Sequence, residues 1–266
     1  MQTVVPRAFT ETMALAGRSL RHIPRSPEKL MDVTIQPVIF LCIFVFVFGS
    51  VISMPGGGSY REFLVAGMFA QAILGPLMGI AVGVADDMHT GIVERLRALP
   101  ITRFSLLGGR AVSELAQSVL MLTVLTTVGL AVGWRPHGSV GETIGAYALL
   151  LLWAFAGIWI GTLLGLFARD GETAQQVGFT VMLPLMFLSA IFVPIGHLAT
   201  PLRQFAEWNP LTSAAMATRT LFHNPSPYVG DAWPLLHPVL ATVLWSCTLI
   251  GVFAPIAVWR YRRVAR

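Results

Sequence analysis

Charged residues are scarce in this sequence. They make up 12% of its 266 residues, lysine occurs once, at Lys29, and 55% of the residues are hydrophobic. A soluble domain carries about 25% charged residues, so this chain has too few to cover a globular surface. Its mean hydropathy is +0.71, and lipid must therefore solvate much of it. These features predict an all-α integral membrane protein.

Cysteine is rare, and nucleotide-binding patterns are missing. Cys42 and Cys247 each stand inside an apolar run, without the spacing of a metal site or of a disulfide framework. No Gly-x-x-x-x-Gly-Lys-Ser/Thr segment occurs, because Lys29 has no glycine before it. ATP binding by a phosphate loop is therefore excluded. We expect this chain to bind no cofactor and no metal.

The histidines and arginines raise two other functional classes, a membrane-embedded enzyme and a nucleic-acid-binding protein, and we disfavour both. His197, His223 and His237 form no metal or nucleophile spacing with acidic residues, so a membrane-embedded enzyme is the weaker hypothesis. The pI of about 9.9 suggests a nucleic-acid partner. However, the arginines stand at the ends of apolar runs, where membrane topology places them, so we expect no nucleic-acid binding.

Six apolar runs are long enough to cross a bilayer, and they predict one transmembrane domain over residues 1–266. The expected spans are 33–52, 62–85, 111–133, 142–168, 174–195 and 238–259. Three further segments remain: a lead-in at 1–32, a polar loop at 86–110 and a region of mixed polarity at 197–237. Pro76, next to Gly75, is expected to bend the second span.

Basic residues are distributed unevenly between the two sides of these spans. All but four of the 18 Lys and Arg residues fall in the lead-in, the 86–110 loop, the 169 link and the C-terminal tail. The other four are Arg61, Arg135, Arg203 and Arg219. By the positive-inside rule, both termini are predicted to be cytoplasmic, which requires an even number of spans.

The span interiors offer little for ion coupling. No charged residue is expected near the middle of a span, since Glu62, Glu114 and Glu142 stand near predicted helix ends. This disfavours a proton- or sodium-coupled carrier. Glycines repeat at spacings of four in two spans, which puts small residues on one helix face for intramolecular packing or for a dimer contact. These glycines are Gly75, Gly79, Gly83, Gly157, Gly161 and Gly165.

Residues 6–23 predict an amphipathic helix that lies on the membrane surface. Apolar residues recur on one face and arginines on the other, a pattern that suits an interface with anionic headgroups. A cytosolic helix packed against a neighbour is the alternative. The residues that define the two faces are Arg7, Phe9, Met13, Arg18, Leu20 and Arg21.

The 86–110 loop carries both signs of charge and predicts a short helix. Apolar Ile92 and Leu96 alternate with Glu94 and Arg95, and Pro100 ends the pattern. Apolar residues on a short cytosolic helix require a partner surface, so a protein contact is favoured over a merely solvated loop.

This loop resembles the one between the second and third spans of type-2 ABC transporter permeases. The similar residues are Gly91-Ile92-Val93-Glu94-Arg95-Leu96, then Leu99-Pro100, then Arg103. Residues 184–195 are similar to that family's fifth helix, and Glu207-Trp208-Asn209-Pro210-Leu211-Thr212 with Arg219 to its external loop. The resemblance covers nearly the whole chain and is closest to the daunorubicin-resistance permease branch. Ala190 departs from the pattern, because many relatives have Gly there.

The resemblance implies a mechanism and a set of partners. The loop would be a coupling helix seated on a separate ATPase subunit, to which ATP and Mg would bind, and the N-terminal helix would touch that subunit too. Two ATPases and a second permease chain, identical or homologous, would complete an exporter in a prokaryotic cytoplasmic membrane. The coupling residues implied are Asp87, Gly91, Ile92, Glu94, Arg95, Leu96, Leu99, Pro100 and Arg103.

The resemblance also implies a gate and a class of cargo. Short external or re-entrant helices over 197–237 would gate the exit, with Pro194, Trp208, Asn209 and Pro210 as gate residues. The cargo implied is amphipathic or lipophilic, a drug-like natural product or a lipid. A permease for a glycan or lipid-linked polymer is the alternative, and a membrane anchor that transports nothing is a third class.

Overall fold

The computed structural model describes residues 34–49, 59–89, 103–192, 195–226 and 230–264. Within these ranges the chain forms helices and short connections and no strand. The prediction of an all-helical protein is confirmed. The first helices are α3 (Gln36–Ile43), continued by the π-helical turn η3 (Phe44–Phe48), then α4 (Tyr60–Ala72), α5 (Pro76–His89), α7 (Arg103–Ala131) and α8 (Val140–Phe167). The later ones are α9 (Gly171–Phe187), η4 (Ile195–His197), α10 (Thr200–Trp208), α11 (Pro210–Phe222), α12 (Trp233–Leu236) and α13 (Pro238–Val264).

Local sequence sets where several helices begin. Ser139 and Glu142 form a capping box at the start of α8, in which the Ser139 side chain accepts from the Glu142 amide. Asp170 caps α9 by accepting from the amide of Thr173 at 2.7 Å. Asn209 caps α11, whose first residue is Pro210.

The second expected span is broken rather than only bent. α4 ends at Ala72 and α5 begins at Pro76, with two tight turns between them, where the amides of Leu74 and Gly75 donate to the carbonyls of Gln71 and Ala72. Proline has no amide hydrogen to donate and its ring clashes with the preceding helical turn. The break therefore falls directly before Pro76.

Two other boundaries differ from the sequence-based expectation. Residues 103–110, expected in the polar loop, belong to α7, and Asp86 to His89 belong to α5, so only 90–102 separate the two helices. The fifth expected span, 174–195, ends as a helix at Phe187. The structure also places Glu114 eleven residues after the start of α7, further from a helix end than predicted.

Within the described ranges, four helical stretches are long and apolar enough to cross a membrane: 60–89, which contains the α4–α5 break, 108–131, 140–167 and 238–261. The apolar helix at 36–47 is shorter, and α9 has 17 residues. The chain is thus built as a multi-pass membrane protein, while the count of six spans stays a prediction.

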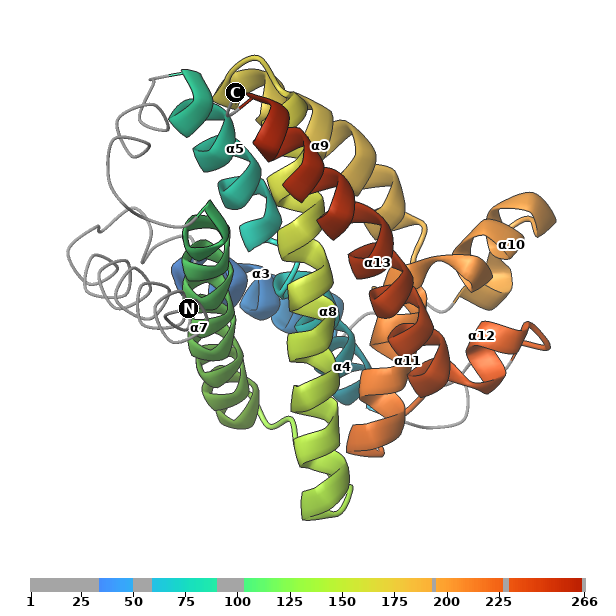
Figure 1. Cartoon of the computed structure of the whole chain (residues 1–266). Helices are drawn as coiled ribbons and strands as arrows, with labels where there is room; N and C mark the ends of the chain where they lie inside the picture. The colour runs from blue at the N-terminus through green and yellow to red at the C-terminus, as the bar shows by residue number, and fades with distance from the viewer. Residues whose placement is uncertain (1–33, 50–58, 90–102, 193–194, 227–229, 265–266) are drawn as a thin grey trace.

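α8 forms the middle of the bundle, with α5 and α13 packed along it and α9 beside α5 (Figure 1). We name the two ends of the bundle by residues. The Asp170 end holds the α8–α9 link, the end of α5, the start of α7 and the end of α13. The His137 end holds the turn between α7 and α8, the start of α4 and the end of α11.

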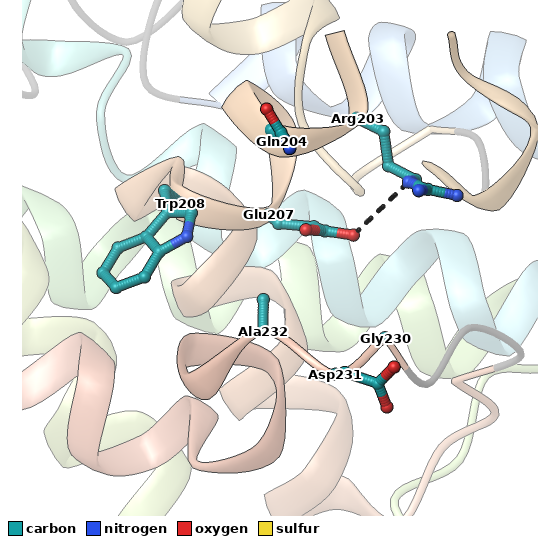
Figure 2. A pocket seen from close by; sticks show the side chains of 7 residues that line it. All are labelled: Arg203, Gln204, Glu207, Trp208, Gly230, Asp231 and Ala232. Atoms are coloured by element: carbon teal, nitrogen blue, oxygen red, sulfur yellow. Dashed lines mark ion pairs between the residues drawn. The ribbon is translucent and has the colours of Figure 1, made fainter. Parts of the chain in front are cut away.

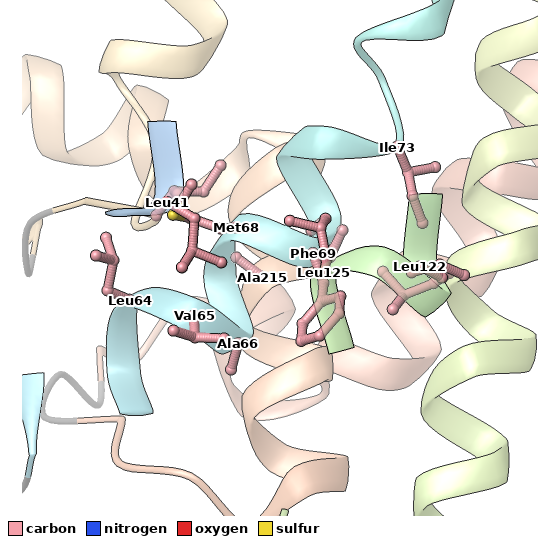
Figure 3. Close-up of a cluster of buried hydrophobic side chains, with 14 of the residues drawn as sticks. Leu41, Leu64, Val65, Ala66, Met68, Phe69, Ile73, Leu122, Leu125 and Ala215 are labelled. Carbon is pink, nitrogen blue, oxygen red and sulfur yellow. The ribbon is translucent and has the colours of Figure 1, made fainter. Parts of the chain in front are cut away.

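The core is centred on α4, whose residues 63–70 are apolar on every side. Leu64, Val65, Ala66, Met68 and Phe69 are all at most 2% exposed. Figure 3 shows them among side chains of α3, α7 and α11, which include Leu41, Leu122, Leu125 and Ala215. A helix that is hydrophobic all round is stable only when enclosed, and here its neighbours enclose it.

Gly161 and Gly165 of α8 lie against the backbone of α5. An added Cβ at Gly161 would lie 2.6 Å from the Leu77 carbonyl oxygen, and one at Gly165 would meet the Ala81 carbonyl. Gly79 takes no part in packing within this chain, because an added Cβ there would meet nothing within 4 Å, and a dimer contact at this residue stays a prediction. Gly75 lies at the helix break, and Gly83 faces the guanidinium of Arg110. The two glycine repeats therefore do not share one function.

Candidate functional site

The most organised polar region surrounds the chain as it leaves α9. At Leu188 the backbone departs from helical geometry, with φ −91° and ψ 43°, and residues 189–192 turn away from the helix axis. Leaving a helix exposes backbone groups that have no partner inside it. In a membrane protein these groups must be satisfied by other parts of the protein.

Asn209 satisfies two of these carbonyls. Its Nδ2 donates to the carbonyl oxygens of Leu185 at 2.7 Å and of Leu188 at 2.8 Å. Its Oδ1 accepts from the Leu211 amide at 2.9 Å. The side chain is 2% exposed. One amide group therefore caps the start of α11 and closes the end of α9.

Thr212 and Tyr60 hold the segment after the break. The Thr212 hydroxyl accepts from the Ala190 amide at 3.1 Å, and the Tyr60 hydroxyl donates to the Phe192 carbonyl at 3.0 Å. Ser189 turns back to donate to the Met186 carbonyl at 2.6 Å. Side chains from α4 and α11 thus hold a stretch of non-helical backbone in one geometry.

Arg219 is the central residue of this arrangement. It is fully buried in α11, its Nε donates to the Phe63 carbonyl at 2.9 Å, and its Nη2 donates to the Ile191 carbonyl at 3.0 Å. The guanidinium lies 3.6 Å from the centre of the Phe63 ring. A Cβ at Gly67 would collide with this guanidinium, so the glycine leaves room for the charge.

A buried charge is costly unless it is paired or hydrogen-bonded. Arg219 forms none of the ion pairs found in the described part of the chain. Backbone carbonyls and an aromatic face stabilise it instead. Sequence reasoning missed this role because it placed Arg219 in a loop and expected no charge inside the bundle. A lone Arg after a run of uncharged and mostly small residues, Ala214 to Thr218, is the signal that was available.

At the Asp170 end, one ion pair joins the helices on either side of 90–102. Arg110 of α7 donates to the Asp87 carboxylate of α5 at 2.8 Å, and its Nη2 lies 3.5 Å from the Ile80 carbonyl. Asp87 therefore lies in α5, and Arg103 is the first residue of α7. The other predicted coupling residues lie outside the described residues: Gly91, Ile92, Glu94, Arg95, Leu96, Leu99 and Pro100.

The remaining predicted site residues fall into two groups. Pro194 and the N-terminal helix residues Arg7, Phe9, Met13, Arg18, Leu20 and Arg21 also lie outside the described ranges. Trp208, Asn209 and Pro210 meet at the junction of α10 and α11, where the Trp208 side chain is 57% exposed and Asn209 is buried. The structure thus separates one predicted gate residue that faces outward from one that anchors α9.

Two histidine–glutamate pairs join separate elements at the His137 end. His137 Nε2 lies 2.9 Å from Glu62 Oε1, and His223 Nε2 lies 2.9 Å from Glu142 Oε1. His223 ends α11 in a left-handed conformation, with φ 53°. The described residues contain no cluster of three His, Cys, Asp or Glu side chains able to hold a metal. One pair therefore links α4 to the turn between α7 and α8, and the other links α8 to the end of α11.

These features define a class of protein. A multi-pass helical bundle with interrupted helices, whose exposed backbone is satisfied by buried polar side chains, is the architecture of a membrane transport domain. The sequence model of the ABC-2 type transporter family matches residues 10–223. The chain therefore belongs to the ABC-2 type transporter family.

Named relatives of this chain are permeases. It is 28% identical over 255 residues to "Daunorubicin resistance ABC transporter permease protein DrrB1" of Streptomyces coeruleorubidus, covering 96% of this chain and 87% of that protein. It is 19% identical over 256 residues to "Probable doxorubicin resistance ABC transporter permease protein DrrC" of Mycobacterium tuberculosis (strain ATCC 25618 / H37Rv), covering 96% and 89%. Over 181 residues it is 20% identical to "Probable multidrug ABC transporter permease YbhR" of Escherichia coli (strain K12), covering 66% and 49%.

Proposed function

We propose that this chain is the membrane-spanning subunit of an ATP-driven exporter for an amphipathic or lipophilic cargo. A separate ATPase subunit, present in two copies, would bind ATP and Mg and supply the energy, and a second permease chain would complete the pathway. Residues 90–102 would seat in the ATPase, with the N-terminal helix beside them. Both termini and the Asp170 end would then face the cytoplasm of a prokaryotic cell, and the His137 end would face outward.

The observation that carries this proposal is the Asp87–Arg110 ion pair beside the proposed coupling segment. It ties the end of α5 to the start of α7 at 2.8 Å, so a force applied to 90–102 acts on both helices. α5 packs along α8 and α9. Its first residue is Pro76, directly after the break that separates it from α4. A push on the segment would therefore reach both interrupted helices, α4–α5 and α9.

The nature of the cargo rests on the relatives and on the surface of α9. Two relatives are named for resistance to daunorubicin and doxorubicin, and one for multidrug transport. The α9 side chains Val177, Phe179, Val181, Leu183 and Phe187 are each at least 43% exposed. An apolar surface of this kind suits a lipophilic cargo or the lipid around it better than a hydrated glycan.

Co-purification with a candidate ATPase tests the proposal. The double substitution Glu94→Arg with Leu96→Asp is expected to abolish co-purification and ATP-dependent export, because it reverses a charge and removes an apolar contact on the coupling segment. Glu172→Arg is the matched control, since Glu172 is exposed at the same end of the bundle, near the start of α9. If the double variant still binds the ATPase and exports, the coupling segment is assigned wrongly.

A further inference from the structure

A cleft lies between α10 and the residues before α12, outside the arrangement that holds α9. It has a volume of about 600 Å³, and it is lined by Arg203, Gln204, Glu207, Trp208, Gly230, Asp231 and Ala232. Figure 2 shows Arg203, Gln204, Glu207 and Trp208 on α10 and Asp231 across the cleft. The volume is within the range of small-molecule sites.

The cleft is lined by side chains of both signs of charge, and Arg203 and Asp231 are not fully paired. Arg203 Nε lies 3.7 Å from Glu207 Oε1, which is an ion pair but is too long for a hydrogen bond. That Nε is buried and has no hydrogen-bond partner in the described part of the chain. Asp231, on the facing segment, forms none of the ion pairs found among the described residues. The cleft therefore offers an anion the guanidinium of Arg203, whose side chain is 39% exposed, and offers a cation the Asp231 carboxylate.

The outward face of α10 is apolar and adjoins this cleft. Leu202, Phe205 and Trp208, spaced by three residues, are 44%, 47% and 57% exposed, while Ala206 on the opposite side is buried. Nearby, Trp233 and Leu236 of α12 are 41% and 52% exposed. Tryptophan at the boundary between an apolar surface and a polar one is typical of the membrane–water interface.

We propose that this cleft binds the headgroup of a zwitterionic phospholipid, while the apolar face of α10 and α12 lies among its acyl chains. Arg203 would bind the phosphate, whose oxygens match the geometry of a guanidinium. The ammonium would pair with the Asp231 carboxylate. Since the lining holds two carboxylates and one guanidinium, an anionic headgroup without an amine is disfavoured. This proposal rests on the proposed function in one respect: the orientation of the exporter places the cleft in the outer leaflet of the membrane.

Native mass spectrometry of the delipidated full chain in detergent, without an ATPase, tests this binding. The probes are dioleoyl phosphatidylethanolamine, dioleoyl phosphatidylglycerol and dodecylamine. We expect the ethanolamine lipid to bind about tenfold more tightly than the glycerol lipid. Arg203→Gln and Asp231→Asn should each weaken ethanolamine-lipid binding about tenfold, the loss of one charged hydrogen bond. Neither an ATPase nor transport is involved in this measurement. Failure of lipid binding would therefore not contradict the exporter proposal, and failure of export would not contradict lipid binding.

The matched controls are Arg61→Gln and Glu172→Gln, both exposed and outside the cleft, and they should bind like the unaltered chain. If Arg203→Gln does not elute as a single species in gel filtration, Asp231→Asn, which lies outside a helix, decides the outcome. Equal binding of the two lipids, unaltered binding by Asp231→Asn, or dodecylamine binding as tight as the ethanolamine lipid would each overturn the assignment. The last result would make the cleft an amine site.

Discussion

Arg219 and Phe63 interact twice: the guanidinium lies 3.6 Å from the centre of the Phe63 ring, and its Nε donates at 2.9 Å to the carbonyl of the same residue. The second arm of the guanidinium reaches the Ile191 carbonyl at 3.0 Å. One side chain of α11 therefore joins α4 to the backbone that follows α9. We therefore expect α9, α11 and the start of α4 to move together.

Replacing Arg219 by Lys should destabilise the protein strongly. A lysine ammonium lacks the planar fork that reaches both carbonyls while stacking on a ring, and hydrogen bonds to charged groups contribute about 1.5–3 kcal/mol each. The apparent melting temperature in detergent, followed by fluorescence-detected gel filtration, should fall clearly. Arg135→Lys, at an arginine that is not buried, is the control and should melt like the unaltered chain. An unaltered melting temperature for Arg219→Lys would show that the charge alone is sufficient.

Asn209 should not tolerate Asp, although Asp is an equally good residue for starting a helix. The substitution keeps an acceptor for the Leu211 amide but turns the donor toward Leu185 and Leu188 into a second acceptor, which faces two carbonyl oxygens. We expect a loss of about 1–3 kcal/mol, measured as resistance to thermal unfolding. Asn209→Ala, which loses the cap as well, provides the comparison. If Asn209→Asp is as stable as the unaltered chain, capping is the whole role of this residue.

Adding one methyl group should have opposite effects at two glycines. Gly161→Ala places a Cβ 2.6 Å from the Leu77 carbonyl oxygen, and overpacking of this kind costs about 1–3 kcal/mol. Gly79→Ala meets open space and should stabilise α5 by about 0.5–1 kcal/mol, the difference in helix preference. Thermal unfolding of the two variants side by side measures the contrast. Equal changes in thermal stability would mean that the backbones of α5 and α8 are not in close contact at Gly161.

Acid should weaken the start of α9. The Thr173 amide and side chain, which donate to the Asp170 carboxylate, hold the pKa of Asp170 below its usual value. A carboxyl whose pKa is lower in the folded state contributes stability above its unfolded pKa, about 3.9, and loses it as pH falls through the folded pKa. Asp170→Asn caps equally well but does not titrate.

The difference in melting temperature between the unaltered chain and Asp170→Asn is the relevant measurement. This difference should be constant around neutral pH. Below about pH 4 the unaltered chain should lose melting temperature relative to Asp170→Asn. A difference that is the same at pH 6 and pH 3 would show that the Asp170 charge does not stabilise α9.

Much of the architecture follows from short-range features of the chain. The start of α8 at Ser139 and Glu142 and the break before Pro76 depend on residues within one helical turn. The end of α9 could not be predicted in this way. Pro184, inside the helix, does not stop it, and the helix ends instead where Asn209, 21 residues further along the chain than Leu188, takes its carbonyls.

The two glycine repeats show the same limit. In sequence, Gly75, Gly79 and Gly83 match Gly157, Gly161 and Gly165 in spacing. In the structure, only Gly161 and Gly165 lie against a neighbouring backbone, because packing requires a partner helix that the spacing does not specify.

By itself, the sequence determined that this is a helical integral membrane protein and where caps and prolines start its helices. It could do so because hydropathy and capping act over a few neighbouring residues. Only the tertiary structure decided that Arg219 is buried, that α9 ends at Phe187, and that Asp87 and Arg110 join α5 to α7. Each of these depends on satisfying a charge or a backbone group with a partner from another helix, and only the folded chain brings those partners together.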